Sequence, residues 1–136
     1  MIALLFLLAQ ATPAEEGVIT AGMAHLGTPY GPSAEKGLLD CSGLVTIAIR
    51  DTGLTIRRIT TRRAFLEWER LPEPRRGGIP MFTHNGKTPA HMGVWLDAGI
   101  RMIHASSSKG VIISSVNKYY WLPRYMVTLK MPLEIW

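Results

Sequence analysis

The hydrophobic residues of this 136-residue chain change their spacing near its middle. In the first half they recur every three to four residues, as in amphipathic helices. The helices predicted on this basis cover residues 13–26, 41–50 and 61–70. In the second half, short apolar runs alternate with turn residues and predict strands. These strands cover residues 92–96, 101–104, 110–113 and 125–129. Helices followed by antiparallel strands predict one α+β domain.

Capping residues stand at the expected helix ends. Thr12 precedes Pro13 and suits an N-cap, and Asp40 occupies the same position before the second helix. Gly27 and Gly53 follow the first two helices, where glycine commonly ends a helix. The sequence therefore places a helix start directly at residue 41.

An unbroken apolar run, Met1–Ala11, precedes the first helix and ends in a small-x-small triplet. It resembles the core and cleavage site of a secretory signal peptide, although no Lys or Arg comes before it. The alternative is an N-terminal hydrophobic helix packed on the domain. The run is too short to span a membrane. We assign residues 1–12 to this segment and 13–136 to the domain, and expect export to the periplasm or cell envelope.

The formal net charge of +5 favours anionic partners. Nucleic acid is one such partner, and a carboxylate-rich polymer such as bacterial cell wall is another. The sequence contains neither zinc-finger spacing nor a basic helix interleaved with aromatic residues, so we predict no nucleic-acid partner. The paired arginines are predicted to be solvated on helix faces and loops: Arg57-Arg58, Arg62-Arg63 and Arg75-Arg76.

Cys41 is the single cysteine, so it forms no internal disulfide. It lies at a predicted helix start after a loop rich in Gly and Pro, where free N–H groups and the helix dipole stabilise a thiolate. Ser42 and Gly43 leave the sulfur uncrowded. We interpret Cys41 as a candidate nucleophile; the alternative is a small buried hydrophobic residue.

A thiolate nucleophile needs a base, and the base needs an orienting group. A two-residue turn at Ala98-Gly99 would put Gly93 opposite His104 and leave His91 diagonal to it, whereas a turn at Asp97-Ala98 would put His91 directly opposite His104. Both registers leave the two histidines on one face. His91 as base and His104 as its orienter fit this geometry. A metal site with Cys41 as third ligand is the alternative. The other two histidines, His25 and His84, are predicted to be structural or surface residues.

Three segments resemble the NlpC/p60 family of cell-wall peptidases: Asp40–Val45, His91–Leu96 and Ile103–Ser106. Residues 110–115 and 120–125 are similar to the tail of its murein endopeptidase branch. The resemblance implies a papain-like fold, with helices packed on an antiparallel sheet, and a cysteine peptidase without a metal or other cofactor. It implies hydrolysis of amide bonds in peptidoglycan stem peptides or cross-links through Cys41, His91 and His104.

The resemblance also implies that Tyr30 positions substrate or steadies the oxyanion, and we add Asp40 and Ser42 as candidate substrate or oxyanion contacts. Two family features are altered: its Gly-Asp pair appears as Gly77-Gly78, and its Gly-Gly as Gly31-Pro32. Alternatives are an inactive peptidoglycan-binding or regulatory domain and an amidase-type antibacterial effector. The effector would reside in the cytoplasm before delivery and have an immunity partner; the enzyme would instead use a protein adaptor.

Overall fold

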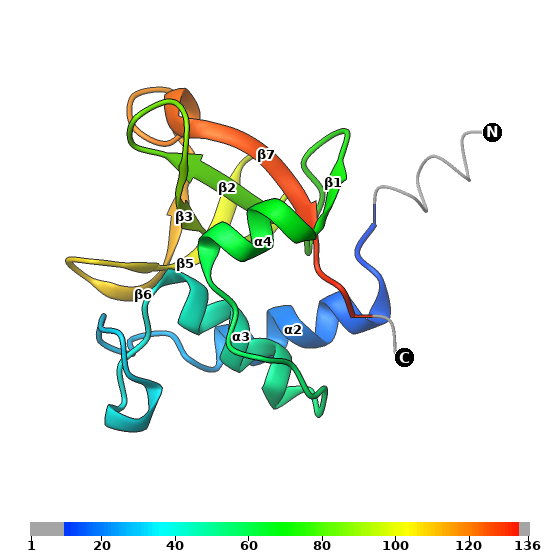
Figure 1. The fold of residues 1–136 in the computed structure, drawn as a ribbon, viewed down its shortest axis with the longest axis vertical. Helices are drawn as coiled ribbons and strands as arrows, with labels where there is room; N and C mark the ends of the chain where they lie inside the picture. Colours follow the sequence, from blue (N-terminus) through cyan, green and yellow to red (C-terminus); the bar gives the residue numbers. More distant parts are fainter. Residues whose placement is uncertain (1–9, 134–136) are drawn as a thin grey trace.

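A computed structural model of the protein describes residues 10–133, so most of the N-terminal apolar run lies outside the described residues. Within this range the chain forms three α-helices, two short 3-10 helices and seven strands (Figure 1). The helices are α2 (Pro13–Met23), η1 (Ala34–Lys36), α3 (Cys41–Asp51), α4 (Thr61–Glu67) and η2 (Leu122–Arg124). The strands are β1 (Glu69–Leu71), β2 (Ile79–Thr83), β3 (Pro89–Met92), β4 (Val94–Asp97), β5 (Arg101–Ser106), β6 (Gly110–Ser115) and β7 (Tyr125–Lys130).

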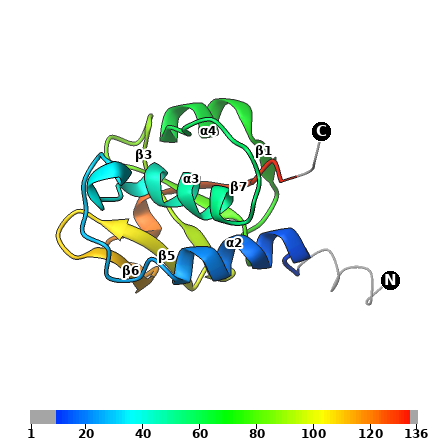
Figure 2. The same ribbon diagram turned by 90° about the horizontal axis from the view of Figure 1, so that it is seen from below.

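The strands form two antiparallel sheets, ordered β1-β7-β2-β3 and β4-β5-β6. Helix α2 packs on α3, α3 contacts β3 and β5, and α4 contacts β3. Figure 2 shows the three helices side by side on one side of the strands. The expected α+β architecture, with N-terminal helices against antiparallel strands, is confirmed. The buried face of α3, which includes Leu44, Val45 and Ala48, anchors the helix in the main core.

Both predicted N-caps are confirmed, whereas the first helix has its C-cap at Ala24 and ends before Gly27. The Thr12 side chain accepts a hydrogen bond from the Glu15 N–H while the Glu15 carboxylate accepts one from the Thr12 N–H, a complete capping box. Asp40 caps α3 by accepting a 2.7 Å hydrogen bond from the Gly43 N–H. Position 41 is therefore the first residue of a helix, as the sequence predicts.

Three predicted elements differ from the structure. The first helix ends at Met23, three residues early. The third ends at Glu67, and Glu69–Leu71 instead pair with β7, because backbone pairing at this sheet edge outweighs helix propensity. The predicted strand 92–96 is interrupted at Gly93, and strand β2, which the sequence prediction omitted, pairs with the first part.

The Gly77-Gly78 departure from the family pattern lies in a well-formed turn. The Gly78 N–H donates to the Arg75 carbonyl at 2.9 Å, and the Trp95 N–H donates to the Gly78 carbonyl at 2.9 Å. A Cβ at Gly78 would lie 2.5 Å from the Thr128 methyl group. An acidic side chain at this position would therefore force Thr128 to move, so glycine matches the local packing of this chain.

The prediction that all paired arginines are solvated is wrong for Arg75. Its guanidinium lies 2.6 Å from the carboxylate of Glu15, which is 2% exposed. The neighbouring Arg76 forms a more exposed pair with Glu16. The two ion pairs link the start of α2 to the segment before β2. Breaking the buried pair would be costly, because it would leave one charge buried without a partner.

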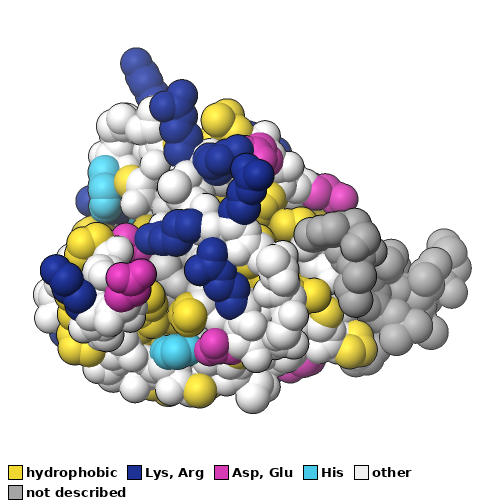
Figure 3. All heavy atoms as spheres, turned by 60° about the horizontal axis from the view of Figure 1, so that its bottom comes forward, with side chains coloured by type: hydrophobic (Ala, Val, Ile, Leu, Met, Phe, Trp, Pro, Cys, Tyr) yellow, Lys and Arg dark blue, Asp and Glu magenta, His cyan; other side chains and the backbone are white. Residues whose placement is uncertain are grey.

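The remaining positive charge does lie at the surface. Figure 3 shows Lys and Arg side chains gathered over α3 and α4. Arg57, Arg62 and Arg63 of this region are exposed. In the described part of the chain, no helix has both the length and the apolar character needed to cross a bilayer.

Candidate active site

Helix α3 presents Cys41 from its first turn. The Cys41 side chain is largely buried, with 8% of the residue exposed. The residues behind it are held by Arg58, whose guanidinium donates to Asp40 at 2.9 Å and to the Ser42 hydroxyl at 3.0 Å. Asp40 therefore serves as both helix cap and ion-pair partner, and Ser42 is buried beside it. The substrate or oxyanion role of Asp40 and Ser42 stays a prediction, since both side chains are occupied by Arg58.

The interruption at Gly93 brings the two histidines together. Strand β3, which carries His91, pairs with β2, whereas β4 begins a second sheet by pairing with β5. A Cβ at Gly93 would lie 2.9 Å from the Ile103 carbonyl oxygen and 3.2 Å from the His104 Cβ. Glycine at position 93 thus allows the backbone to pass close to β5 at His104. This close approach lets the His91 ring reach the His104 ring.

Of the two registers expected for this hairpin, the structure has the one that places Gly93 opposite His104, with a difference at the turn. Val94 pairs with Ile103, the register that places Gly93 opposite His104. The turn contains three residues rather than two, and a bulge between Trp95 and Asp97 restores the register. His91 consequently lies diagonal to His104, as predicted, although the two residues belong to different sheets.

A chain of hydrogen bonds joins the two histidines to a serine. His91 Nε2 lies 2.9 Å from His104 Nδ1, and His104 Nε2 lies 2.7 Å from Ser114 Oγ. With both rings neutral, one proton arrangement has His91 donating to His104, and His104 donating to Ser114. This arrangement leaves the lone pair of His91 Nδ1 free to accept a proton.

Sequence reasoning missed Ser114, although strand alternation contains the information needed to find it. Ile112 pairs directly with His104, so Ser114, two residues further along β6, projects from the same face. The predicted strand ended at residue 113, two residues before the end of β6. A longer β6 would have placed a hydroxyl beside the outer nitrogen of His104.

An aromatic side chain covers the histidine pair. The Trp121 ring stacks on His91 with centroids 5.0 Å apart and meets His104 edge-on at 5.1 Å. Burial, followed by the nearby charges of His104 and His84, lowers the pKa of His91 to about 3. Burial lowers the pKa of His104 to about 4. Both rings are therefore neutral at neutral pH, the state in which a histidine can act as a base.

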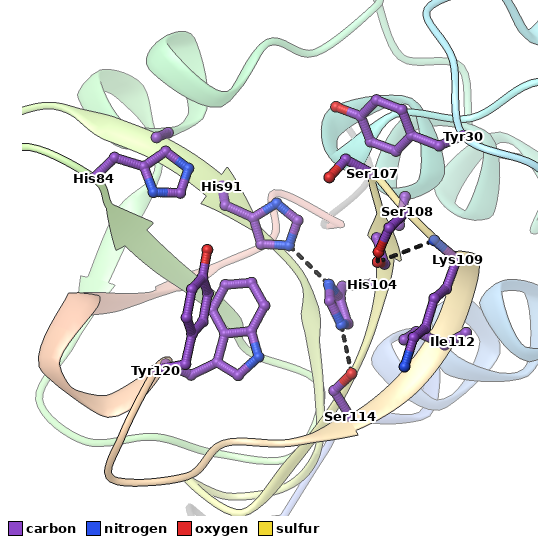
Figure 4. Close-up of a pocket in the computed structure, with 14 residues that line it drawn as sticks. Tyr30, His84, His91, His104, Ser107, Ser108, Lys109, Ile112, Ser114 and Tyr120 are labelled. Carbon is purple, nitrogen blue, oxygen red and sulfur yellow. Dashed lines mark hydrogen bonds between the residues drawn. The ribbon is translucent and has the colours of Figure 1, made fainter.

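The histidine pair opens onto a cavity of about 550 Å³ (Figure 4). Tyr30 lies at one end of this cavity and Ser114 at the other, with His91 and His104 along the wall between them. Burial, then the charges of Cys41 and Asp40, raises the pKa of the Tyr30 phenol. Tyr30 thus keeps its proton at neutral pH and is available as a hydrogen-bond donor near the candidate nucleophile.

The structure does not join all the candidate residues directly. The thiol of Cys41 contacts the Thr61 hydroxyl at 3.4 Å, and within residues 10–133 no hydrogen bond connects it to His91. Thr61, at the start of α4, was also missed by the sequence analysis. Among the described residues, no group of three or more His, Cys, Asp or Glu side chains is arranged to hold a metal ion.

The other two histidines have different positions. His25 bonds to Asp51 at 2.7 Å and links the ends of α2 and α3, which confirms its structural role. His84 is exposed in the loop after β2, as predicted, but it also lines the cavity. Its proximity to His91 was not expected from the sequence.

Comparison with known proteins gives a consistent result. The model of the NlpC/P60 family matches residues 27–130. The chain is 32% identical over 111 residues to the probable peptidoglycan endopeptidase LytE of Bacillus subtilis, covering 80% of this chain and 32% of LytE. It is 36% identical over 96 residues to the murein DD-endopeptidase/murein LD-carboxypeptidase MepS of Escherichia coli, covering 70% of this chain and 50% of MepS. The chain thus spans between a third and a half of the length of these relatives.

The fold agrees with solved structures. A crystal structure of an NlpC/P60 family protein from Bacillus cereus superposes with a TM-score of 0.74 at 26% sequence identity. The match covers 88% of this chain and 41% of the Bacillus protein.

Proposed function

Because the chain belongs to the NlpC/P60 family, we propose that it is a cysteine peptidase that cleaves amide bonds in peptidoglycan stem peptides or cross-links. The similarity to LytE, a probable peptidoglycan endopeptidase, and to MepS, a murein DD-endopeptidase, supports this substrate class. The observation that carries the proposal is the His91–His104–Ser114 chain, which lines a cavity together with Tyr30, whose pKa the charges of Cys41 and Asp40 help to raise. The proposed place of action is the cell envelope, where this polymer lies. A protein adaptor that targets the enzyme to its substrate remains part of this proposal.

The proposed reaction begins with proton transfer from the Cys41 thiol to Nδ1 of His91. The sulfur attacks the amide carbonyl carbon, and the resulting oxyanion accepts hydrogen bonds from the Cys41 N–H and the Tyr30 hydroxyl. His91 then returns the proton to the leaving amine, and the C–N bond breaks to give a thioester. Water attacks the thioester with His91 as base, which releases the carboxylic acid and restores the thiol.

His104 has the role of an orienting group in this proposal. Its Nδ1 accepts the hydrogen bond from His91 Nε2 only when its own proton lies on Nε2, the nitrogen next to Ser114. Ser114 therefore favours the His104 tautomer that keeps His91 Nδ1 unprotonated. The hydrogen bonds through His104 and Ser114 also hold the His91 ring in one orientation, so that its Nδ1 is positioned before the reaction begins.

The contact between Cys41 and Thr61 gives the resting position of the nucleophile. Attack requires the thiol to exchange this 3.4 Å contact for one with His91. Catalytic hydrogen bonds are often formed fully only when substrate is bound, so the resting geometry is compatible with catalysis.

The test is digestion of purified muropeptides by the wild-type protein and by Cys41→Ala, with new amine termini and product masses measured. Hydrolysis should fall at least about a thousandfold in the variant, since the nucleophile is removed. Circular dichroism of both proteins controls for folding. Equal product from the two proteins would disprove the assignment of Cys41.

A second candidate is a peptidoglycan-binding or regulatory domain without turnover. It is favoured by one observation: the thiol is bonded to Thr61 rather than to the histidine pair. Sedimentation with purified cell-wall sacculi, combined with amine detection, distinguishes the two functions. Binding of the wild-type protein without new amine termini would support the second candidate.

A further inference from the structure

The cavity beside the histidine pair contains one permanently charged side chain. Among the 14 residues that line it, Lys109 is the one lysine or arginine, and none is an aspartate or glutamate. Burial keeps His91 and His104 neutral at neutral pH, since it lowers their pKa values to about 3 and 4. The side chain of Lys109 is therefore the main source of positive charge in the cavity.

The hairpin that carries Lys109 is held against the rest of the domain. At its tip, the Lys109 N–H donates to the Ser106 hydroxyl at 3.3 Å. Just after the turn, the Val111 N–H donates to the Thr28 carbonyl at 2.9 Å, in the loop that leads to Tyr30. The flexible lysine side chain thus begins from a fixed backbone, and Figure 4 shows it running along the cavity wall toward Ile112.

The chemistry of this wall suits a carboxylate. The hydroxyls of Ser106, Ser107 and Ser108 line the same cavity as the Lys109 ammonium, and all four groups can donate hydrogen bonds to an anion. Because none of the described lining residues is acidic, no negatively charged side chain in the cavity would repel a bound anion. A volume of about 550 Å³ lies within the range of small-ligand sites and accommodates a short peptide.

A carboxylate fits this wall better than a phosphate does. Phosphate sites commonly use planar arginine forks, and no arginine is among the described residues that line the cavity. A single ammonium group in a cavity that serine hydroxyls also line matches a group with one negative charge. In a peptide substrate, that group is a free carboxylate.

We propose that Lys109, with the hydroxyls of Ser107 and Ser108, binds a free carboxylate of the peptide substrate. Stem peptides that carry carboxylates are thereby selected over stem peptides in which these groups are carboxamides. This inference rests on the proposed function and names the group that the same cavity recognises. Lys109 is a specificity residue in this scheme and takes no part in bond cleavage.

The experiment measures peptide binding by calorimetry in a Cys41→Ala background, so that the ligand is not consumed. The two probes are a synthetic stem tetrapeptide with free carboxylates and the same peptide with carboxamides. Lys109→Met is compared with Lys109→Arg, which keeps the charge. Lys118→Met is the matched control, because Lys118 lies over the Tyr119 ring and does not line the cavity.

Lys109→Met should weaken binding of the carboxylate peptide about fivefold, the size expected for a partly exposed ion pair. Binding of the carboxamide peptide should change by less than about twofold, as should binding of either peptide to Lys109→Arg or Lys118→Met. The preference for the carboxylate peptide should decline as salt is raised, since the charge is exposed. Equal weakening of both peptides by Lys109→Met, no weakening of either, or no binding of either peptide to the parent protein would overturn the proposal.

The binding assay also separates this inference from the proposed function. If the wild-type protein, which keeps Cys41, hydrolyses neither peptide while binding still depends on Lys109, the peptidase activity is refuted and the carboxylate site is not. Hydrolysis of both peptides with the same KM in wild type and Lys109→Met would refute the carboxylate site and leave the activity standing.

Discussion

Acid should destabilise this protein well above the pH at which most carboxylates titrate. The folded-state pKa values of His91 and His104, about 3 and about 4, lie below the ordinary histidine value of 6.5. The unfolded chain therefore binds more protons than the folded chain as the pH falls through 6.5, and stability is lost in that direction. The contribution of the pair is fully present above pH 6.5 and declines until the folded-state values are reached.

The size of this effect follows from the two pKa shifts. One buried histidine contributes a slope that approaches about 1.4 kcal/mol per pH unit. Integrated from pH 6 to pH 5, the two histidines together lower the free energy of unfolding by about 2 kcal/mol. This loss is a large part of the roughly 5–15 kcal/mol that stabilises a typical domain. The lowered pKa of Glu16 has its effect below about pH 5, outside this window.

Urea titrations followed by tryptophan fluorescence at pH 7, 6 and 5 measure the loss. His91→Gln should lose about 1 kcal/mol between pH 6 and 5, half the wild-type loss, because one of the two groups remains. The double variant His91→Gln/His104→Gln should show little change in this interval. A wild-type free energy of unfolding that is constant from pH 6 to 5 would refute the assignment of neutral, buried histidines.

Three further predictions follow from packing. Glu15→Gln should destabilise the protein by about 3 kcal/mol in urea titrations, because its buried arginine partner loses its counter-charge, whereas Glu16→Gln in the exposed pair should cost less than about 1 kcal/mol. Gly93→Ala should reduce muropeptide hydrolysis more than about tenfold by displacing β5 from the histidine pair, whereas Gly17→Ala, in helix α2 where a Cβ would meet the Thr52 methyl group at 3.6 Å, should leave hydrolysis unchanged. Trp121→Ala should hydrate the histidine on which the indole stacks and raise its pKa, shifting the acid limb of the pH–rate profile to higher pH. Similar losses for both glutamates, activity in Gly93→Ala equal to that of the control, or an unmoved acid limb would contradict the respective prediction.

The order of elements and the positions of Cys41, His91 and His104 were accessible from local pattern. Capping residues located the start of α3, and the parity of strand positions placed the two histidines on one face. These inferences depend on interactions between residues close in sequence or across one hairpin. Such interactions are encoded in spacing, which explains why they could be read without a structure.

The features that the sequence analysis missed or predicted wrongly depend on contacts between segments that are distant in sequence. Strand β1 forms because β7, about 60 residues later, offers it a pairing edge, and no local signal competes with the helical pattern there. Arg75 is buried because Glu15 lies opposite it in the fold, although as a member of an arginine pair it looks like a surface residue in the sequence. Thr61 is near the thiol only because α4 packs on β3 beside α3.

Burial connects the stability of this domain to its proposed chemistry. Burial beneath Trp121 excludes water from His91 and lowers its pKa, which keeps the ring unprotonated in the resting protein. The same exclusion makes protonation of the folded state costly, so the proposed base and the acid sensitivity have one physical cause. A substitution that relieves the acid sensitivity by admitting water at His91 should therefore also alter the pH dependence of hydrolysis. Independent behaviour of these two properties across such variants would show that burial of His91 does not set its role as base.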